Sequence, residues 1–213
     1  VLVMDRIATT FRQREATCGA VARSIRALIQ GRVGNYLIFF PSYTYLNRVH
    51  DEFLTLKEPV TVALQRPAMS EADRDGFIQK FHEVHHQSLV GFAVMGGLFG
   101  EGIDLAGERL VGAVVVGVGL PQVSLERELI RRHFDVDCDA GYEFAYTFPG
   151  MNRVLQAAGR VIRSETDRGI LLLIDARFGH ARYRELAPPW WERRFLKDAG
   201  QVLEHAKQFW QME

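Results

Sequence analysis

Short apolar runs alternate with longer segments of helical spacing along this chain, and this alternation restricts the fold more than any other feature of the sequence. Five runs have the length and apolar content of buried strands, and they occupy residues 36–40, 60–64, 91–95, 111–118 and 170–174. Apolar strands separated by helices are typical of a parallel sheet that is covered on both faces. The sequence therefore predicts an α/β fold: a three-layer sandwich with a mostly parallel sheet between two layers of helices.

The segments between these runs carry helix signals, and helices are expected at residues 14–30, 43–56, 70–86 and about 195–211. In the first of them, apolar residues recur at positions i, i+4, i+7 and i+8 and so share one helix face. Ser42 and Ser70 precede the second and third helices as candidate N-caps. The more polar segment at about 124–146, between the fourth and fifth strands, predicts a small helical insertion.

The length of 213 residues fits one domain with a core of its own. The chain begins with Val1 rather than Met. We therefore expect residues 1–213 to form one domain of a longer protein.

Charge and composition limit the partners of the chain. Its 26 Lys and Arg residues balance 26 Asp and Glu residues. Any binding of nucleic acid therefore has to depend on a local group of residues and not on an overall positive charge. The longest apolar run, Leu110 to Pro121, is shorter than the ~20 residues of a membrane-spanning helix, and no membrane partner is expected. The two cysteines, Cys18 and Cys138, form no Cys-x-x-Cys pair, so we expect no disulfide framework, no cysteine-bound metal and a reducing cytosolic location.

The segment 156–163, with the sequence QAAGRVIR, carries the most informative polar pattern. At about 100° per residue, a helix would bring Gln156, Arg160 and Arg163 to one face. Two neighbouring guanidinium groups favour an anion between them, and phosphate matches their geometry. Gly159 indicates either a close backbone approach or the end of the helix. The alternative is a solvated helix face whose arginines pair with Glu165 or Asp167.

A glycine-rich loop follows the predicted strand at 91–95. Residues 96–104 read GGLFGEGID, with glycines at 96, 97, 100 and 102. Backbone N–H groups of such a loop can approach an anion at the edge where α/β sheets bind ligands, and Glu101 and Asp104 add acceptors. A tight turn that requires positive φ is the alternative.

Ser42 and Tyr43 follow the predicted strand at 36–40. A serine at a helix N-terminus can bind phosphate through its hydroxyl and the adjacent amides, and a tyrosine beside it can stack on a base. The alternative for Ser42 is a plain N-cap.

One motif indicates different chemistry. Residues 82–86 read HEVHH and match H-E-x-x-H, which on a helix places two histidines one turn apart for zinc. The match lies at the C-terminal end of its predicted helix, where the helix dipole favours histidines, and it lacks an identifiable third ligand. We expect no metal site in this chain.

The chain also lacks a P-loop, because none of its glycines is followed by lysine. It cannot bind a nucleoside triphosphate in that cradle by itself.

Three of these segments, taken in order, resemble the C-terminal RecA-like motor domain of XPD/DinG-type superfamily 2 helicases. LIFFPSYTYL (37–46) is similar to motif IV of that family, residues 96–121 to motif V and its following strand, and QAAGRVIRSETDRGILLLIDARF (156–178) to motif VI. The resemblance covers nearly the whole chain, and its third motif is highly specific. It implies a RecA-like fold.

The resemblance also implies how ATP is hydrolysed. Two RecA-like domains enclose ATP with Mg²⁺, and the first domain, N-terminal to this one, supplies the P-loop. Arg163 would be the arginine finger on the γ-phosphate, assisted by Arg160, while Gln156 and Asp104 would couple the nucleotide to domain closure. Glu101, Gly102 and Gly159 would complete the nucleotide side of the site.

Single-stranded DNA would lie across both domains and contact Ser42, Tyr43, Gly97 and Gly100 of this chain. Family members often have serine at the position of Gly100, so one hydroxyl contact to phosphate would be replaced by the backbone amide. The iron–sulfur cysteines of the family belong to the first motor domain, and neither Cys18 nor Cys138 corresponds to them.

Two hypotheses from different classes remain open at this point. In the first, the chain is the second motor domain of an ATP-dependent DNA helicase that moves 5′ to 3′ and is inactive as an isolated fragment. In the second, it is a standalone module that uses Arg160, Arg163 and the glycine loop only to bind a partner or nucleic acid. Zinc hydrolysis through the H-E-x-x-H match ranks third.

Overall fold

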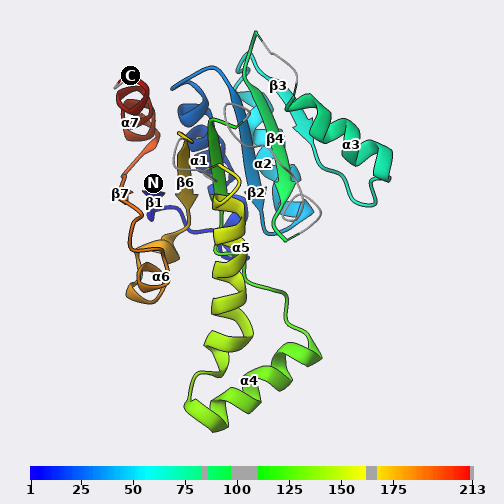
Figure 1. Ribbon diagram of the computed structural model, residues 1–213, viewed down its shortest axis with the longest axis vertical. Coiled ribbons are helices and arrows are strands. Elements are labelled where there is room, and N and C mark those ends of the chain that lie inside the picture. The colour runs from blue at the N-terminus through cyan, green and yellow to red at the C-terminus, as the bar shows by residue number, and fades with distance from the viewer. Residues whose placement is uncertain (83–85, 97–109, 162–166, 212–213) are drawn as a thin grey trace.

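The computed structural model describes residues 1–82, 86–96, 110–161 and 167–211. Its centre is a seven-stranded sheet in the order β3-β4-β2-β5-β6-β1-β7 (Figure 1). The strands are β1 (Leu2–Met4), β2 (Asn35–Phe40), β3 (Thr61–Leu64), β4 (Leu89–Val94), β5 (Gly112–Val116), β6 (Ile170–Ile174) and β7 (Arg194–Phe195). Every strand pairing among the described residues is parallel, which confirms the predicted α/β class.

Helices cover both faces of this sheet. The helices of the described residues are α1 (Arg14–Ile29), α2 (Tyr43–Thr55), α3 (Glu71–Lys80), α4 (Leu125–Cys138), α5 (Phe148–Ala158), α6 (Ala181–Glu185) and α7 (Ala199–Gln211), with a π-helical turn at Glu143–Thr147 and a 3₁₀ turn at Ala176–Gly179, and all but α4 lie against the sheet. Helices α1, α2 and α7 pack on one face, where Ile38 and Phe40 of β2 point. Helices α3, α5 and α6 contribute to the core on the other face, against Leu37 and Phe39.

The sheet is larger than the sequence predicts. The five predicted strands are present, but two further strands, β1 and β7, extend the sheet beyond β6. Strand β1 lies between β6 and β7. Both added strands are very short, so neither gives a recognisable apolar run. Residues 194–195 therefore form a strand, and the C-terminal helix begins at Ala199, later than predicted.

Helix α3 is shorter than predicted. It begins after Ser70, whose hydroxyl accepts a hydrogen bond from the Asp73 backbone at 3.2 Å, while the Asp73 carboxylate accepts one from the Ser70 backbone at 3.1 Å. This capping box fixes the start. The helix ends at Lys80, with Phe81 as its C-cap and buried against Phe77. Residues 83–85 lie outside the described residues.

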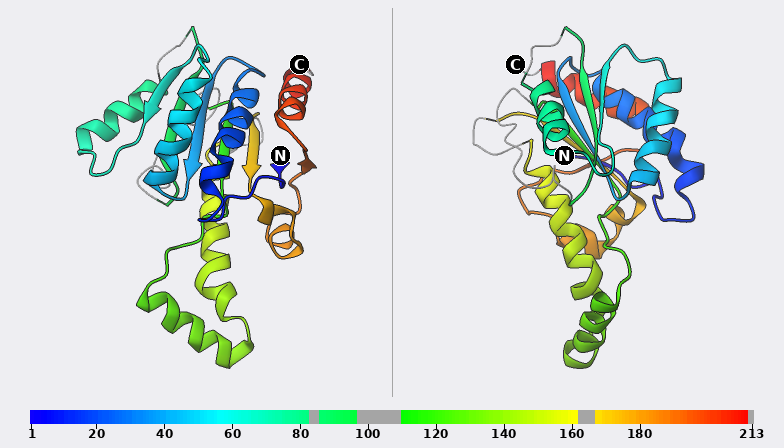
Figure 2. Two further views of the ribbon diagram at one scale, coloured as in Figure 1. Left: turned by 180° about the vertical axis from the view of Figure 1, so that it is seen from behind. Right: turned by 90° about the vertical axis from the view of Figure 1, so that its right-hand side faces the viewer.

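Residues 123–147, which we call the arm, extend away from the sheet (Figures 1 and 2). Ser124 caps α4 by accepting a hydrogen bond from the Arg127 backbone at 3.3 Å. After α4, Asp139 adopts a left-handed conformation with φ of 53°, and the chain turns into the π-helical segment that continues as α5. The rings of Phe134 and Phe144 stack across this turn with their centroids 4.0 Å apart. The arm is thus a helical hairpin joined to the domain through α5.

Candidate functional site

The carboxyl ends of the parallel strands form the edge of the sheet at which α/β proteins bind ligands. Ser42 and Tyr43 follow β2 at this edge, Gly96 follows β4 and Asp175 follows β6. The other predicted group, Gln156 and Arg160, lies elsewhere. These two residues come at the far end of α5, where Val161 packs close to Gly169, directly before β6. The structure therefore places the predicted residues in two separate groups.

Helix α5 ends between Gln156 and Arg160, so the helix is shorter here than the sequence predicts. Gln156 lies in the last turn of α5 and is exposed, but the helix ends at Ala158. The Gly159 N–H donates to the Leu155 carbonyl at 2.9 Å, and the Arg160 N–H donates to the Ala157 carbonyl at 3.2 Å in the turn that follows. The interpretation of Gly159 as the end of the helix is confirmed. Arg163 lies outside the described residues.

Helix α5 borders two glycine-containing turns at the carboxyl edge. A Cβ atom at Gly96, where φ is +70°, would come within 2.9 Å of Nε of Arg153. The same arginine donates from Nη1 to the Gly119 carbonyl at 3.3 Å. Burial, followed by the positive charge of Arg127, lowers the pKa of Arg153. Arg153, which the sequence analysis missed, therefore packs against Gly96 at the start of the glycine-rich loop and hydrogen-bonds to the turn after β5.

The predicted contacts of the rest of that loop cannot be compared with the structure. Gly97, Gly100, Glu101, Gly102 and Asp104 lie outside the described residues. Their predicted contacts to nucleotide and DNA stay predictions.

Ser42 is held by the first turn of α2, and Tyr43 by residues at the ends of neighbouring strands. Ser42 accepts a hydrogen bond from the Tyr45 backbone at 3.4 Å, so it is an N-cap of α2. Tyr43 is half-buried, and its hydroxyl accepts a hydrogen bond from Nε2 of Gln65 at 3.0 Å. The buried Gln65 in turn accepts one from the Val94 backbone at 2.7 Å through Oε1. This chain of bonds fixes Tyr43 against the ends of β3 and β4.

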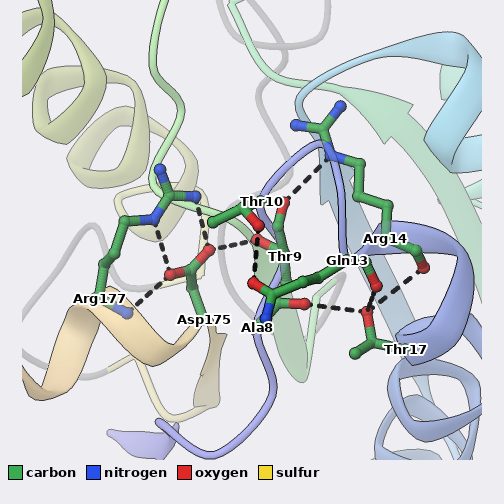
Figure 3. Close-up of polar contacts among 8 residues, drawn as sticks. All are labelled: Ala8, Thr9, Thr10, Gln13, Arg14, Thr17, Asp175 and Arg177. Carbon is green, nitrogen blue, oxygen red and sulfur yellow. Dashed lines mark hydrogen bonds and ion pairs between the residues drawn. The ribbon is translucent and has the colours of Figure 1, made fainter.

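A buried carboxylate organises the end of β6 (Figure 3). Asp175 is 1% exposed and accepts the Thr9 hydroxyl. Arg177 binds it in a bidentate manner, with Nε at 2.9 Å from Oδ1 and Nη2 at 2.7 Å from Oδ2. Burial by itself lowers the pKa of Arg177, but the hydrogen bonds and charge of Asp175 outweigh burial and hold that pKa above its ordinary value. The network joins the chain after β1 to the turn after β6.

A second arginine lies on the other side of Thr9 (Figure 3). Nε of Arg14, the first residue of α1, donates to the Thr9 carbonyl at 3.1 Å, and its guanidinium lies 5.0 Å from the centroid of the Tyr45 ring. Burial first, and then the charge of Arg177, lowers the pKa of Arg14. Two guanidinium groups therefore flank Thr9 at the carboxyl edge. The sequence analysis missed this pair, although a charged Asp-x-Arg directly after an apolar strand was a usable signal.

The H-E-x-x-H match is only partly visible. His82 lies in the turn after α3, and residues 83–85 are outside the described part of the chain. Among the described residues, no three His, Cys, Asp or Glu side chains gather in a way that could hold a metal ion.

Over the four described stretches, none of the helices combines the length and the apolar character needed to cross a bilayer.

An all-parallel sheet in this strand order, with helices on both faces, is a RecA-like fold. The chain belongs to the helicase C-terminal domain family, which matches residues 25–194. The resemblance to XPD/DinG-type helicases is thereby confirmed.

The chain is similar to proteins that are named as helicases. A regulator of telomere elongation helicase 1 homolog from Aedes aegypti is 26% identical over 207 residues, which cover 82% of this chain and 20% of that protein. The ATP-dependent DNA helicase chl-1 of Caenorhabditis elegans is 28% identical over 213 residues, covering 94% of this chain and 25% of its own length. The chain thus spans about a fifth to a quarter of these relatives.

Solved structures support the fold. A structure entitled "XPD_APO" superimposes with a TM-score of 0.71 at 19% identity, covering 92% of this chain and 39% of that one. The C-terminal domain of the DEAD-box protein Dbp5 superimposes with a TM-score of 0.54 at 14% identity, and the match covers 98% of this chain and 96% of that domain. The predicted RecA-like fold is confirmed.

Proposed function

We propose that this chain is the second motor domain of an ATP-dependent DNA helicase that moves 5′ to 3′. The observation that carries the proposal is the family match over residues 25–194, which includes all three segments of the sequence resemblance. A P-loop is absent from the chain, so a first RecA-like domain of the same protein would bind most of the ATP and Mg²⁺. An iron–sulfur cluster in that first domain stays a prediction, as does a cytosolic location.

The nucleotide side of the site would lie beyond the end of α5. There Gln156 lies in the last turn of α5, Arg160 follows the end of the helix, and Arg163 comes three residues later as the proposed arginine finger. Phosphoryl transfer depends mainly on positioning and on neutralising charge, which an arginine from a second domain supplies when the domains close. Gly102, Asp104, Glu101 and Gly159 complete the proposed nucleotide contacts.

The nucleic-acid side would follow the carboxyl edge of the sheet. Ser42, Tyr43, Gly97 and Gly100 are its proposed contacts to single-stranded DNA. The guanidinium group of Arg14 lies at the same edge and supports this proposal, because phosphate contacts dominate the affinity for nucleic acids, whereas that of Arg177 is already bound by Asp175. The hydroxyl of Ser42 already caps α2. It would therefore have to serve both as the N-cap and, together with the Ser42 backbone, as a contact to DNA phosphate.

The test is ATP hydrolysis and strand unwinding by the full protein that contains this chain. We expect hydrolysis that depends on single-stranded DNA, and unwinding of a duplex with a 5′ overhang. A full protein that binds DNA without hydrolysing ATP would favour the standalone binding module instead. Unwinding from a 3′ overhang alone would leave the motor assignment intact and contradict the polarity.

Replacing Tyr43 tests the proposed track. We expect Tyr43→Ala to weaken the binding of single-stranded DNA by about 1 to 3 kcal/mol, which is the usual loss when a stacking ring is removed. Tyr43→Phe is the matched control, because it keeps the ring and loses only the hydrogen bond with Gln65. Fluorescence anisotropy with a labelled oligonucleotide measures both. Equal affinities of the wild-type and Tyr43→Ala proteins would remove Tyr43 from the track.

Ser42→Ala separates capping from binding. Loss of the N-cap of α2 should lower the free energy of unfolding by about 1 kcal/mol. A chemical denaturation curve measures this change, and the anisotropy assay measures any accompanying loss of DNA affinity. An unchanged denaturation midpoint would show that the hydroxyl does not stabilise α2.

A further inference from the structure

A buried amide group is in contact with Tyr43. Gln65 follows the last residue of β3 and is 3% exposed. Its backbone N–H donates to the Phe92 carbonyl at 2.9 Å and so continues the pairing of β3 with β4. A buried polar side chain is costly unless its donors and acceptors are bonded, so the partners of this amide group indicate what it does.

The partners of Gln65 fix the orientation of its amide group. The backbone N–H of Val94 can only donate, and it lies 2.7 Å from the amide atom that is therefore the oxygen, Oε1. The other amide atom is then Nε2, which can also only donate, and it lies 3.0 Å from the Tyr43 hydroxyl. A flipped amide group would bring two donors together at Val94. The Tyr43 hydroxyl therefore accepts the hydrogen bond from Gln65.

The direction of this bond leaves the proton of the Tyr43 hydroxyl available. A phenolic hydroxyl carries one proton and can donate as well as accept. Among the residues that the structure describes, none accepts this proton, and the contact with Gln65 is only partly buried. Tyr43 is the first residue of α2, at the carboxyl edge of the sheet. Gln65 thus holds a hydrogen-bond donor at the edge where the DNA track is proposed.

We propose that the Tyr43 hydroxyl donates a hydrogen bond to a phosphate oxygen of single-stranded DNA, and that Gln65 is the positioning residue that directs it. Tyrosine side chains are among the groups that bind the DNA backbone, which receives at least about half of all hydrogen bonds between proteins and DNA. A glutamate at position 65 would accept from the Val94 N–H equally well, but it would also take the proton of Tyr43. The amide group is therefore needed for the free donor. The inference rests on the proposed function, because it requires that Tyr43 contacts DNA.

Binding of single strands with altered phosphates to the full protein tests the proposed contact. The probes are labelled oligonucleotides whose register is fixed by a duplex end, and in which one phosphate at a time is replaced by an uncharged methylphosphonate. At one position, the replacement should weaken binding to the wild-type protein by about tenfold, the scale of one hydrogen bond to a charged group. This loss should disappear in Tyr43→Phe, which keeps the ring and lacks the donor.

Gln65→Glu tests the role of the amide group. The variant keeps an acceptor for the Val94 N–H, so we expect it to keep the fold, which thermal unfolding measures. It should nevertheless bind unaltered DNA about tenfold more weakly and lose the same phosphate-specific effect. The matched control for its added charge is Gln65→Glu in the Tyr43→Phe background, where it should have little further effect. If Gln65→Glu does not fold, the phosphate replacements with Tyr43→Phe still test the contact.

The outcomes separate this inference from the proposed function. Wild-type affinity in Tyr43→Ala would contradict the DNA track and this inference together. Weakened binding in Tyr43→Ala, combined with wild-type affinity in Tyr43→Phe, would leave the track intact and overturn the phosphate contact. A loss in Tyr43→Phe without a loss in a folded Gln65→Glu variant would show that Gln65 does not direct the hydroxyl.

Discussion

Arg163→Ala in the full protein is expected to lower the rate of DNA-stimulated ATP hydrolysis by about 10³-fold. An arginine finger supplied across an interface stabilises the charge that develops in the transition state and accounts for about 10³ to 10⁵ in rate. Removing it should leave ATP binding and DNA binding largely intact, because the proposed finger acts on the transition state. Steady-state hydrolysis with saturating single-stranded DNA measures the loss.

Two further variants make this result specific. Arg163→Lys keeps the charge but loses the planar fork, so its rate should stay well below that of the wild type. Arg23→Ala removes an exposed arginine on α1 and should have the wild-type rate. If Arg163→Ala turns over ATP at a near-normal rate, Arg163 is not the finger. If every variant and the wild type fail to hydrolyse ATP, the motor assignment itself is wrong.

Asp175→Ala is expected to lower the free energy of unfolding by about 3 kcal/mol, the scale for breaking one half of a buried ion pair. Asp175 accepts hydrogen bonds from the side chains of Thr9 and Arg177 and from the Arg177 backbone. Its removal leaves the fully buried Thr9 hydroxyl and the mostly buried Arg177 guanidinium without this acceptor. Urea denaturation followed by circular dichroism measures the change.

Two milder substitutions keep this prediction testable if the alanine variant does not fold. Thr9→Val removes one hydroxyl from the network and should cost about 1 to 2 kcal/mol. Asp75→Asn changes an exposed carboxylate on α3 and should be within about 0.5 kcal/mol of the wild type. A loss below about 1 kcal/mol for Asp175→Ala would show that the network does not stabilise the fold.

Three of the predicted strands consist entirely of buried residues. In β2, all six residues are buried, and in β5 and β6 all five are, so each contains an uninterrupted run of four or five apolar residues. In contrast, the two residues of β7 are exposed, and Arg194 is held by donating its backbone N–H to the Val1 carbonyl at 2.9 Å. Such a strand is defined by its partner alone, and no local pattern reveals it.

In the candidate site, too, features that depend on neighbouring residues could be predicted, and contacts between distant residues could not. The cap at Ser42 and the helix end at Gly159 follow from local chemistry, and both could be predicted. The Thr9–Asp175 contact joins residues 166 positions apart, and it forms only because β1 and β6 are neighbours in the sheet. Arg153 was missed for a similar reason, since its partners lie on loops from two other strands.

The pairing of β1 with β6 also sets the order in which the chain can fold as it is made. Leu2 pairs with Leu172, so the first strand waits until about 170 more residues have been synthesised, on the order of ten seconds or longer at 5 to 20 residues per second. Strands β2 to β5 can pair with one another earlier, because their mutual pairings do not require β6. A growing chain that stops before β6 therefore exposes the apolar Leu2, Val3 and Met4 together with an open edge on β5. That interval is when this domain is most exposed to aggregation and to capture by chaperones.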